Sequence, residues 1–248
     1  MDTLGKTPET LESVRISLED ELEPYWEELD GFVQEKIRSI VKPSHFKYFE
    51  ACIFKLKALW YIHSRVEDLD VKYGNLVDTF LDQKLFDRFV KDSDGTFSYF
   101  PFFEALEFEN LLNQGKACLD CFAKAAGSTF GDSPNNISKL ESVLKPRRSQ
   151  IASQLLHKIE VSKRHLDGIL LDPKKGKKSI RDLVSHREHA SIRFRIDAAG
   201  RSRHAIVRSD HPEVVRLSNY HVTEISTRVW YHTRQLVAES LPLFFERV

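Results

Sequence analysis

Apolar residues recur at helical spacing over long stretches of this chain, and this pattern limits most strongly the folds it can adopt. Between residues 45 and 70, the repeating apolar positions are Phe46, Phe49, Ile53, Leu56, Trp60 and Val66. A stripe with this period forms the buried face of an amphipathic helix. Similar helices are predicted over 17–41 and 102–127. Because long amphipathic helices outnumber strands, we predict a mainly α-helical fold, a bundle of long helices.

Proline and glycine predict where several helices end. Pro43 ends the first helix, and the sequence "YGN" predicts a break near Gly74, before a shorter helix over 75–90. Gly127 stands where a C-terminal capping glycine is expected for the helix over 102–127.

The second half of the chain has one ambiguous helical stretch and one closing helix. Residues 137–171 are predicted to be helical, with Pro146 either kinking one helix or starting a second. Pro212 occupies a favourable starting position for a long closing helix that runs to residue 245.

A small β-hairpin is predicted between these helical regions. Ile192, Phe194 and Ile196 alternate with polar residues, which is the period of a half-exposed strand, and a second such stretch follows Gly200. We therefore predict one domain over 1–248, with a peripheral N-terminal segment over 1–16 and a hairpin inserted at 190–208.

The chain shows no feature of a secreted or membrane protein. Its N-terminal segment lacks the basic and apolar parts of a signal peptide, and no window reaches the roughly 18 apolar residues of a membrane helix. The cysteines are Cys52, Cys118 and Cys121, an odd number that favours reduced thiols. We expect a cytoplasmic protein with no membrane partner.

Charge is unevenly distributed although the formal net charge is zero. Basic residues clearly outnumber acidic ones between Lys139 and Asp210, and the rest of the chain is acidic. This asymmetry either provides a positive surface for phosphates or lets the two parts attract each other or a second copy. If the surface binds nucleic acid, the candidate residues are Lys174, Lys175, Lys177, Lys178, Arg187, Arg193 and Arg195.

Common catalytic and cofactor-binding motifs are missing. The chain has no GxxxxGK[ST], GxGxxG or HExxH sequence. The pair Cys118 and Cys121 lies within an amphipathic helix, and no second Cys/His pair with suitable spacing completes a zinc site. We therefore expect no metal site and no cofactor. His186 and His189 could share a metal, but the sequence offers no further ligands for such a metalloenzyme.

The stretch "IRDLVSH" contains the candidate catalytic residues Arg181, Asp182 and His186. An arginine fork suits a phosphate, a histidine can transfer a proton near neutral pH, and RNA carries its own nucleophile, the 2′-hydroxyl. Such a site could cleave RNA without a metal, with Asp182 orienting either side chain. Five positions along a straight helix correspond to a turn of about 500°, so the two side chains meet only at a helix end, across a bend or with a second subunit.

Spacing alone does not identify this motif. An arginine also precedes a histidine at similar spacing in Arg38/His45 and in Arg216/His221, a frequency close to that expected by chance. Only the pair at 181 and 186 also has an acid beside the arginine, a basic loop before it and a basic strand after it.

In a bundle of long helices, "IRDLVSH" resembles the motif of the HEPN superfamily, an arginine, often a polar neighbour, and a histidine four to six residues on. The resemblance implies a mostly dimeric helical bundle and, in active members, a metal-independent endoribonuclease of toxin–antitoxin, CRISPR-associated or phage-defence systems. It implies that Arg181 holds the scissile phosphate, that His186 is the acid/base and that Asp182 supports them. The partners would be RNA, a second copy and an antitoxin or other protein.

A non-catalytic function remains as the alternative. The same bundle could bind nucleic acid, a nucleotide or a protein through the basic hairpin, with Arg181 and His186 in structural roles. Exposed and convergent Arg181 and His186 side chains would favour the enzyme, whereas side chains held in intramolecular bonds would favour the binding module.

Overall fold

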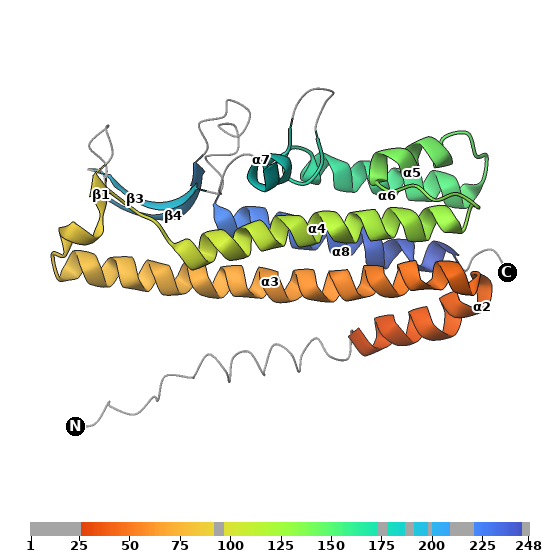
Figure 1. Cartoon of the computed structure of the whole chain (residues 1–248), viewed down its shortest axis with the longest axis horizontal. Helices are drawn as coiled ribbons and strands as arrows, with labels where there is room; N and C mark the ends of the chain where they lie inside the picture. The colour runs from red at the N-terminus through yellow and green to blue at the C-terminus, as the bar shows by residue number, and fades with distance from the viewer. Residues whose placement is uncertain are drawn as a thin grey trace.

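Long helices that run side by side make up most of this computed structural model (Figure 1). It describes residues 26–91, 97–172, 178–186, 191–197, 200–208 and 221–244. The mainly helical fold predicted from the sequence is confirmed. None of the helices within these ranges has an apolar stretch long enough to cross a bilayer. The α-helices after the N-terminal segment are α3 (Pro43–Asp82), α4 (Phe102–Ser128), α5 (Ile137–Leu144), α6 (Gln150–Leu166), α7 (Ile180–His186) and α8 (Val222–Ser240).

Helix α3 is a single helix of 40 residues, so the predicted break near Gly74 is wrong. Glycine costs about 1 kcal/mol relative to alanine inside a helix, too little to end one that packs along its length. A Cβ at Gly74 would meet no atom within 4 Å, so no close approach requires a glycine there.

Helix α4 packs along α3, and α8 lies against both. The apolar stripe predicted on α3 forms one side of this seam, and the large fully buried side chains of α4 form the other. On α3 they are Phe49, Leu56 and Leu59, and on α4 they are Phe108, Leu111, Leu112, Leu119 and Phe122.

A buried histidine joins α3 to α8. The His63 Nδ1 atom lies 2.8 Å from the Ser226 hydroxyl, and its ring stacks on Trp230 with the centroids 6.3 Å apart. Burial lowers the pKa of His63 to about 4. The ring is therefore neutral at physiological pH. Its hydrogen bond with Ser226 pairs two polar groups inside the helix seam.

The described N-terminal helix covers residues 26–40 and packs under α3. It includes a π-helical stretch (Val33–Ile37) and α2 (Arg38–Ile40). Its first described residue, Trp26, packs its ring against Trp60 of α3 and Trp230 of α8. The apolar side of the described part therefore faces the bundle, and residues 17–25 of the predicted helix lie outside the described residues.

Two helices, α5 and α6, occupy the stretch around Pro146. The side chain of Asn136 accepts a hydrogen bond from the backbone of Lys139 and caps α5. Ser149 caps α6 in the same way through the backbone N–H of Ala152. A second helix is therefore present, but Pro146 lies between the two helices and neither kinks the first nor starts the second.

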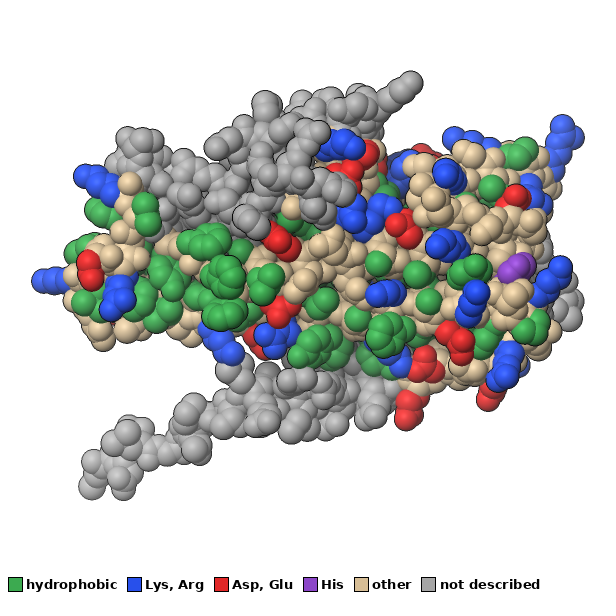
Figure 2. Space-filling view, in the orientation of Figure 1, with side chains coloured by type: hydrophobic (Ala, Val, Ile, Leu, Met, Phe, Trp, Pro, Cys, Tyr) green, Lys and Arg blue, Asp and Glu red, His purple; other side chains and the backbone are tan. Residues whose placement is uncertain are grey.

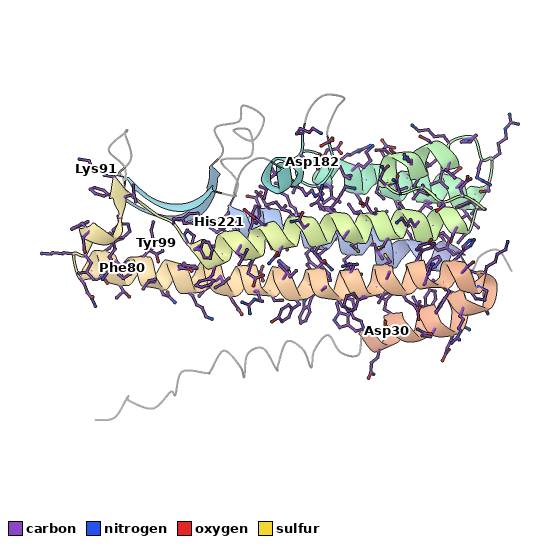
Figure 3. The ribbon with its side chains drawn as sticks, viewed as in Figure 1. Asp30, Phe80, Lys91, Tyr99, Asp182 and His221 are labelled. Atoms are coloured by element: carbon purple, nitrogen blue, oxygen red, sulfur yellow. The ribbon has the colours of Figure 1, made fainter. Side chains whose placement is uncertain are left out.

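Four short strands form an antiparallel sheet in the order β1-β2-β3-β4. They are β1 (Val90–Lys91), β2 (Phe97–Tyr99), β3 (Ser191–Asp197) and β4 (Gly200–Arg208). Tyr99 of β2 packs against Phe80 of α3 and against Phe89, with ring centroids 5.8 Å and 6.3 Å apart (Figure 3). This aromatic contact fixes the sheet to the end of α3.

The closing helix does not run unbroken from Pro212 to residue 245 as predicted. His221 has extended backbone angles and caps α8, which begins at Val222. The helix ends at Ser240, and a 3-10 turn (Pro242–Phe244) follows. Residues 209–220 lie outside the described residues.

Gly127 has a different role from the predicted C-terminal cap. It is buried inside the last turn of α4, which continues to Ser128. A Cβ at Gly127 would lie 2.1 Å from the ring Cδ of Pro134. The glycine is therefore needed for a close approach between α4 and the loop that follows it.

We predict that Gly127→Ala destabilises the protein by about 1–3 kcal/mol or more, since the added methyl group overlaps a rigid ring. Urea denaturation followed by circular dichroism measures the effect. Gly74→Ala is the matched control. It should stabilise the protein by about 0.5–1 kcal/mol, because it removes a helical glycine without a clash. Equal stability of the two variants would contradict the packing role of Gly127.

Candidate functional site

Backbone hydrogen bonds and a buried isoleucine fix the start of α7. The N–H groups of Ile180 and Arg181 donate to the carbonyls of Gly168 and Ile169, at 2.9 Å and 3.0 Å. Ile180 is 1% exposed and packs into the core beside α4. The Ser179 hydroxyl accepts from the Asp182 N–H at 3.3 Å, which is the geometry of an N-cap. The short helix is therefore held firmly at its first turn.

Arg181 is half-buried, with 26% of its side chain exposed. Its Nη1 atom donates to Asp182 Oδ1 at 2.9 Å. Its Nε atom is buried and has no hydrogen-bond partner in the part of the chain that the structure describes. One edge of the guanidinium is thus anchored, and a donor on the other edge is not satisfied.

Asp182 lies between two cations. Its Oδ2 atom is 3.5 Å from the ammonium group of Lys178, and its Oδ1 atom binds Arg181. Burial alone would raise the pKa of Asp182, but the hydrogen bonds and charges of Arg181 and Lys178 outweigh it and lower the pKa. The carboxylate stays ionised at neutral pH and positions the arginine.

The other predicted site residues are described only in part. His186 is the last residue of α7, and its side chain lies outside the described residues, as do Lys174, Lys175, Lys177 and Arg187. Arg193 and Arg195 lie in β3, and only their backbone is described. Arg195 pairs there with Ser98 of β2. The structure thus brings together Arg181, Asp182 and Lys178.

Cys118 and Cys121 both lie in α4, with Cys118 buried and Cys121 partly exposed. Cys118 is fully buried and faces Cys52 of α3, with each thiol about one hydrogen-bond length from the carbonyl of the other residue, at 3.7 Å and 3.8 Å. The hydrogen bond with Cys118, then burial, raise the pKa of Cys52, so this thiol is protonated at neutral pH. No group of three or more His, Cys, Asp or Glu side chains in the described ranges could hold a metal ion.

Glu104 is an unusual residue that sequence reasoning missed. It lies in the first turn of α4, is 0% exposed, and neither carboxylate oxygen has a hydrogen-bond partner within the described ranges. Burial, with a contribution from Asp70, raises its pKa to about 8. The residues around Glu104 predicted only the helix over 102–127, because Asp70, whose charge acts on Glu104, is distant in the chain and belongs to α3.

His221 also acquires a defined environment that its sequence did not indicate. Its Nδ1 atom accepts from the N–H of Thr223 at 3.3 Å and caps α8. Its Nε2 atom lies 4.0 Å from Asp70 Oδ1. At the point where α8 meets α3, the Nδ1 atom is thus hydrogen-bonded and the Nε2 atom faces Asp70. Only 20% of the His221 side chain is exposed.

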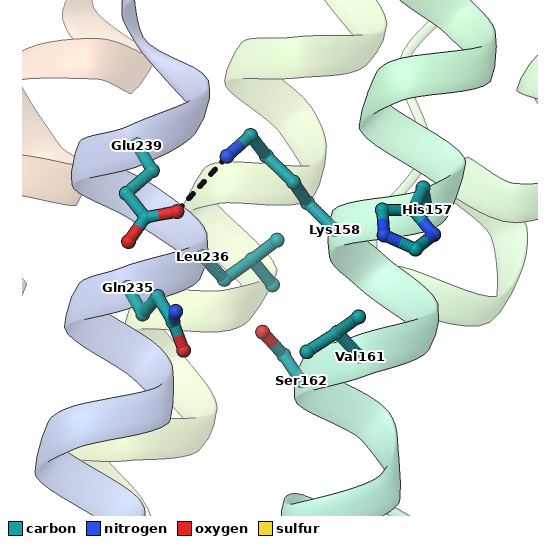
Figure 4. A pocket seen from close by; sticks show the side chains of 7 residues that line it. All are labelled: His157, Lys158, Val161, Ser162, Gln235, Leu236 and Glu239. Carbon is teal, nitrogen blue, oxygen red and sulfur yellow. Dashed lines mark hydrogen bonds and ion pairs between the residues drawn. The ribbon is translucent and has the colours of Figure 1, made fainter.

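A groove lies between α6 and α8. Its cavity of about 210 Å³ is crossed by an ion pair between Lys158 and Glu239 at 2.9 Å (Figure 4). The remaining lining residues are His157, Val161, Ser162, Gln235 and Leu236. Because the ion pair neutralises the two charges, the groove has no clear preference for an anion or a cation.

Aromatic side chains are exposed over the start of α4, where Figure 2 shows hydrophobic side chains gathered. Phe102 and Phe103 are 59% and 61% exposed, and their rings pack edge to face with the centroids 5.5 Å apart. Phe100 and Leu106 extend this surface. Contiguous exposed apolar groups of this kind are typical of an interaction surface.

Comparison with known proteins identifies no relative of this chain. No protein-family model matches it, and neither the curated proteins nor the solved structures contain a match. The functional argument therefore depends on the residues and contacts described above.

We predict that Glu104→Gln changes the pH dependence of stability. The pKa of Glu104 is raised in the folded state, so its stabilising contribution is full below the unfolded value near 4.5 and is lost as the pH rises through about 8. The variant should match the wild type at pH 5 and exceed it by a few kcal/mol at pH 9. Thermal unfolding at both pH values measures this.

Glu109→Gln on the same helix is the control, since Glu109 is partly exposed. It should leave the pH profile unchanged. A wild-type profile that is flat between pH 5 and 9 would contradict a neutral, buried Glu104.

Proposed function

We propose that this protein is a HEPN-like, metal-independent endoribonuclease of a toxin or phage-defence system, with the hairpin as an insertion in the helical bundle. Arg181 would hold the scissile phosphate, Asp182 would orient Arg181, and His186 would be the acid/base. The observation that carries the proposal is the state of Arg181. Its guanidinium is anchored by Asp182, and its buried Nε donor has no acceptor among the residues that the structure describes.

A phosphate oxygen would satisfy that donor. Leaving a buried donor unpaired costs about 1–3 kcal/mol, and a charge-assisted bond to phosphate is among the stronger hydrogen bonds in proteins. Lys178, with about half of its side chain exposed, adds a second cation next to Asp182. The lysines at 174, 175 and 177 precede it in the sequence. The segment therefore provides more positive than negative charge for a polyanion.

The chemistry needs only the RNA and these side chains. The 2′-oxygen of one nucleotide attacks the adjacent phosphorus, the bond from phosphorus to the 5′-oxygen breaks, and a 2′,3′-cyclic phosphate and a 5′-hydroxyl result. In this scheme His186 transfers the proton, and Arg181 stabilises the charge that develops on the phosphoryl oxygens.

The geometry of α7 favours a site made by two copies. The helix has seven residues, with Arg181 in its first turn and His186 at its end. Side chains five positions apart project in directions that differ by about 140°, so one straight helix does not bring them together. The resemblance to HEPN proteins implies a homodimer in which two motifs meet.

A second function is supported by a specific observation. Arg181 is half-buried and already bonded to Asp182, which is the arrangement expected of a structural residue. In that case the protein is a non-catalytic helical module that binds nucleic acid or a partner protein, such as an antitoxin, through its basic segment and hairpin. Such binding would weaken with salt because phosphate contacts release counterions.

We predict that the wild type cleaves total RNA in excess EDTA and that His186→Ala lowers the rate by about 10²–10⁴-fold, because a positioned acid/base contributes that much. Denaturing gels follow the cleavage, and circular dichroism verifies the fold. His45→Ala is the matched control, since His45 follows Arg38 at similar spacing but lies at the start of α3. It should retain full activity.

Mixing Arg181→Ala with His186→Ala tests the two-copy site. Partial recovery of cleavage is expected, because mixed dimers can contain one intact pair. If neither the wild type nor any variant cleaves RNA while salt-dependent RNA binding persists, the binding module is correct and the ribonuclease is not.

A further inference from the structure

The carboxyl group of Glu104 is enclosed at the junction of α3, α4 and α8. The residue is 0% exposed, and neither oxygen accepts a hydrogen bond from any residue that the structure describes. Native structures rarely leave such a group without a partner, because the loss of water is not compensated. An unpaired carboxyl at this position indicates a missing donor.

Other polar residues extend from Glu104 towards the surface. Asp70 is close enough for its charge to raise the pKa of Glu104, and 18% of the Asp70 side chain is exposed. His221, with its Nε2 atom 4.0 Å from Asp70, is 20% exposed. Glu104 is therefore enclosed, whereas Asp70 and His221 are partly exposed.

Two tyrosine rings complete the surroundings. Tyr73 and Tyr99 pack with their centroids 6.0 Å apart and a tilt of 46°. Burial raises the pKa of Tyr73, and the nearby Tyr99 and Glu104 add to the rise, whereas a hydrogen bond with the backbone of Phe103 opposes it. Tyr73 is therefore a neighbour of the carboxyl, and the faces of such rings attract organic cations.

The composition of the cluster suits an organic cation. The described side chains offer no group of three or more metal ligands, and two aromatic rings are poor partners for a hydrated metal ion. A guanidinium or a primary ammonium, in contrast, can donate to two carboxylates and lie against a ring.

We propose that Asp70 and Glu104 bind one organic cationic group, a guanidinium or a primary ammonium, with Tyr73 and Tyr99 beside it. The group reaches Glu104 past Asp70 and His221. Its positive charge favours the ionised form of Glu104, so binding releases a proton and strengthens between pH 6 and pH 8. This site is separate from α7 and does not depend on the ribonuclease proposal.

Isothermal titration calorimetry with phenylguanidine tests the site on the full-length protein. Phenylurea is the matched neutral ligand, with nearly the same shape. We expect binding of phenylguanidine only, and different apparent heats at pH 7 in phosphate and Tris buffers because a proton is released. Equal binding of phenylurea, or no binding of phenylguanidine at pH 8, would overturn the proposal.

Variants locate the binding. Glu104→Gln and Asp70→Asn should each weaken the binding of phenylguanidine at least tenfold. Glu104→Gln should also abolish the difference in apparent binding heat between the two buffers. Glu109→Gln, on the same helix, should leave the affinity unchanged. Asp70→Asn keeps the test decisive if Glu104→Gln alters the fold. Wild-type affinity in a folded Asp70→Asn variant would place the ligand elsewhere and reject this site.

Discussion

The apolar seam between α3 and α4 is the interaction on which the rest of the fold depends. Both helices bury large side chains along their facing sides, and α8 closes the third side. The N-terminal helix packs on α3 through Trp26, α7 packs on α4 through Ile180, and the sheet is fixed to the end of α3 by Tyr99. Removal of the seam would leave these smaller elements without a surface to bury.

Two polar residues buried inside the helix seam, His63 and Glu104, differ in their hydrogen bonding. His63 has a hydroxyl partner and a stacked ring, so its burial as a neutral group is well compensated. Glu104, in the first turn of α4, has no hydrogen-bond partner among the described residues. A fold can tolerate an unpaired buried group, but at a cost in stability. We therefore interpret His63 as structural and propose a binding role for Glu104.

Local patterns predicted the helices well, and non-local contacts explain what they missed. The stripe from Phe46 to Val66 is a local signal, and the helix it predicted is present. The continuity of α3 through Gly74 depends on packing over its whole length, and the close approach at Gly127 depends on Pro134. In the candidate site, the contact of Arg181 with Asp182 is between neighbours, so the sequence could suggest it. The meeting of Glu104 with Asp70 required knowledge of how α3 and α4 pair.

The length of α3 restricts how this chain can change during evolution. A helix of 40 residues extends about 60 Å, and one side of it contacts different partners at its two ends. Inserting one residue near its middle would rotate one end relative to the other by about 100°, so that either the tryptophan cluster or the sheet contact would face solvent. Additions of three or four residues nearly restore the facing side. Homologues of different size should therefore differ in α3 by whole turns, and in their loops by any number.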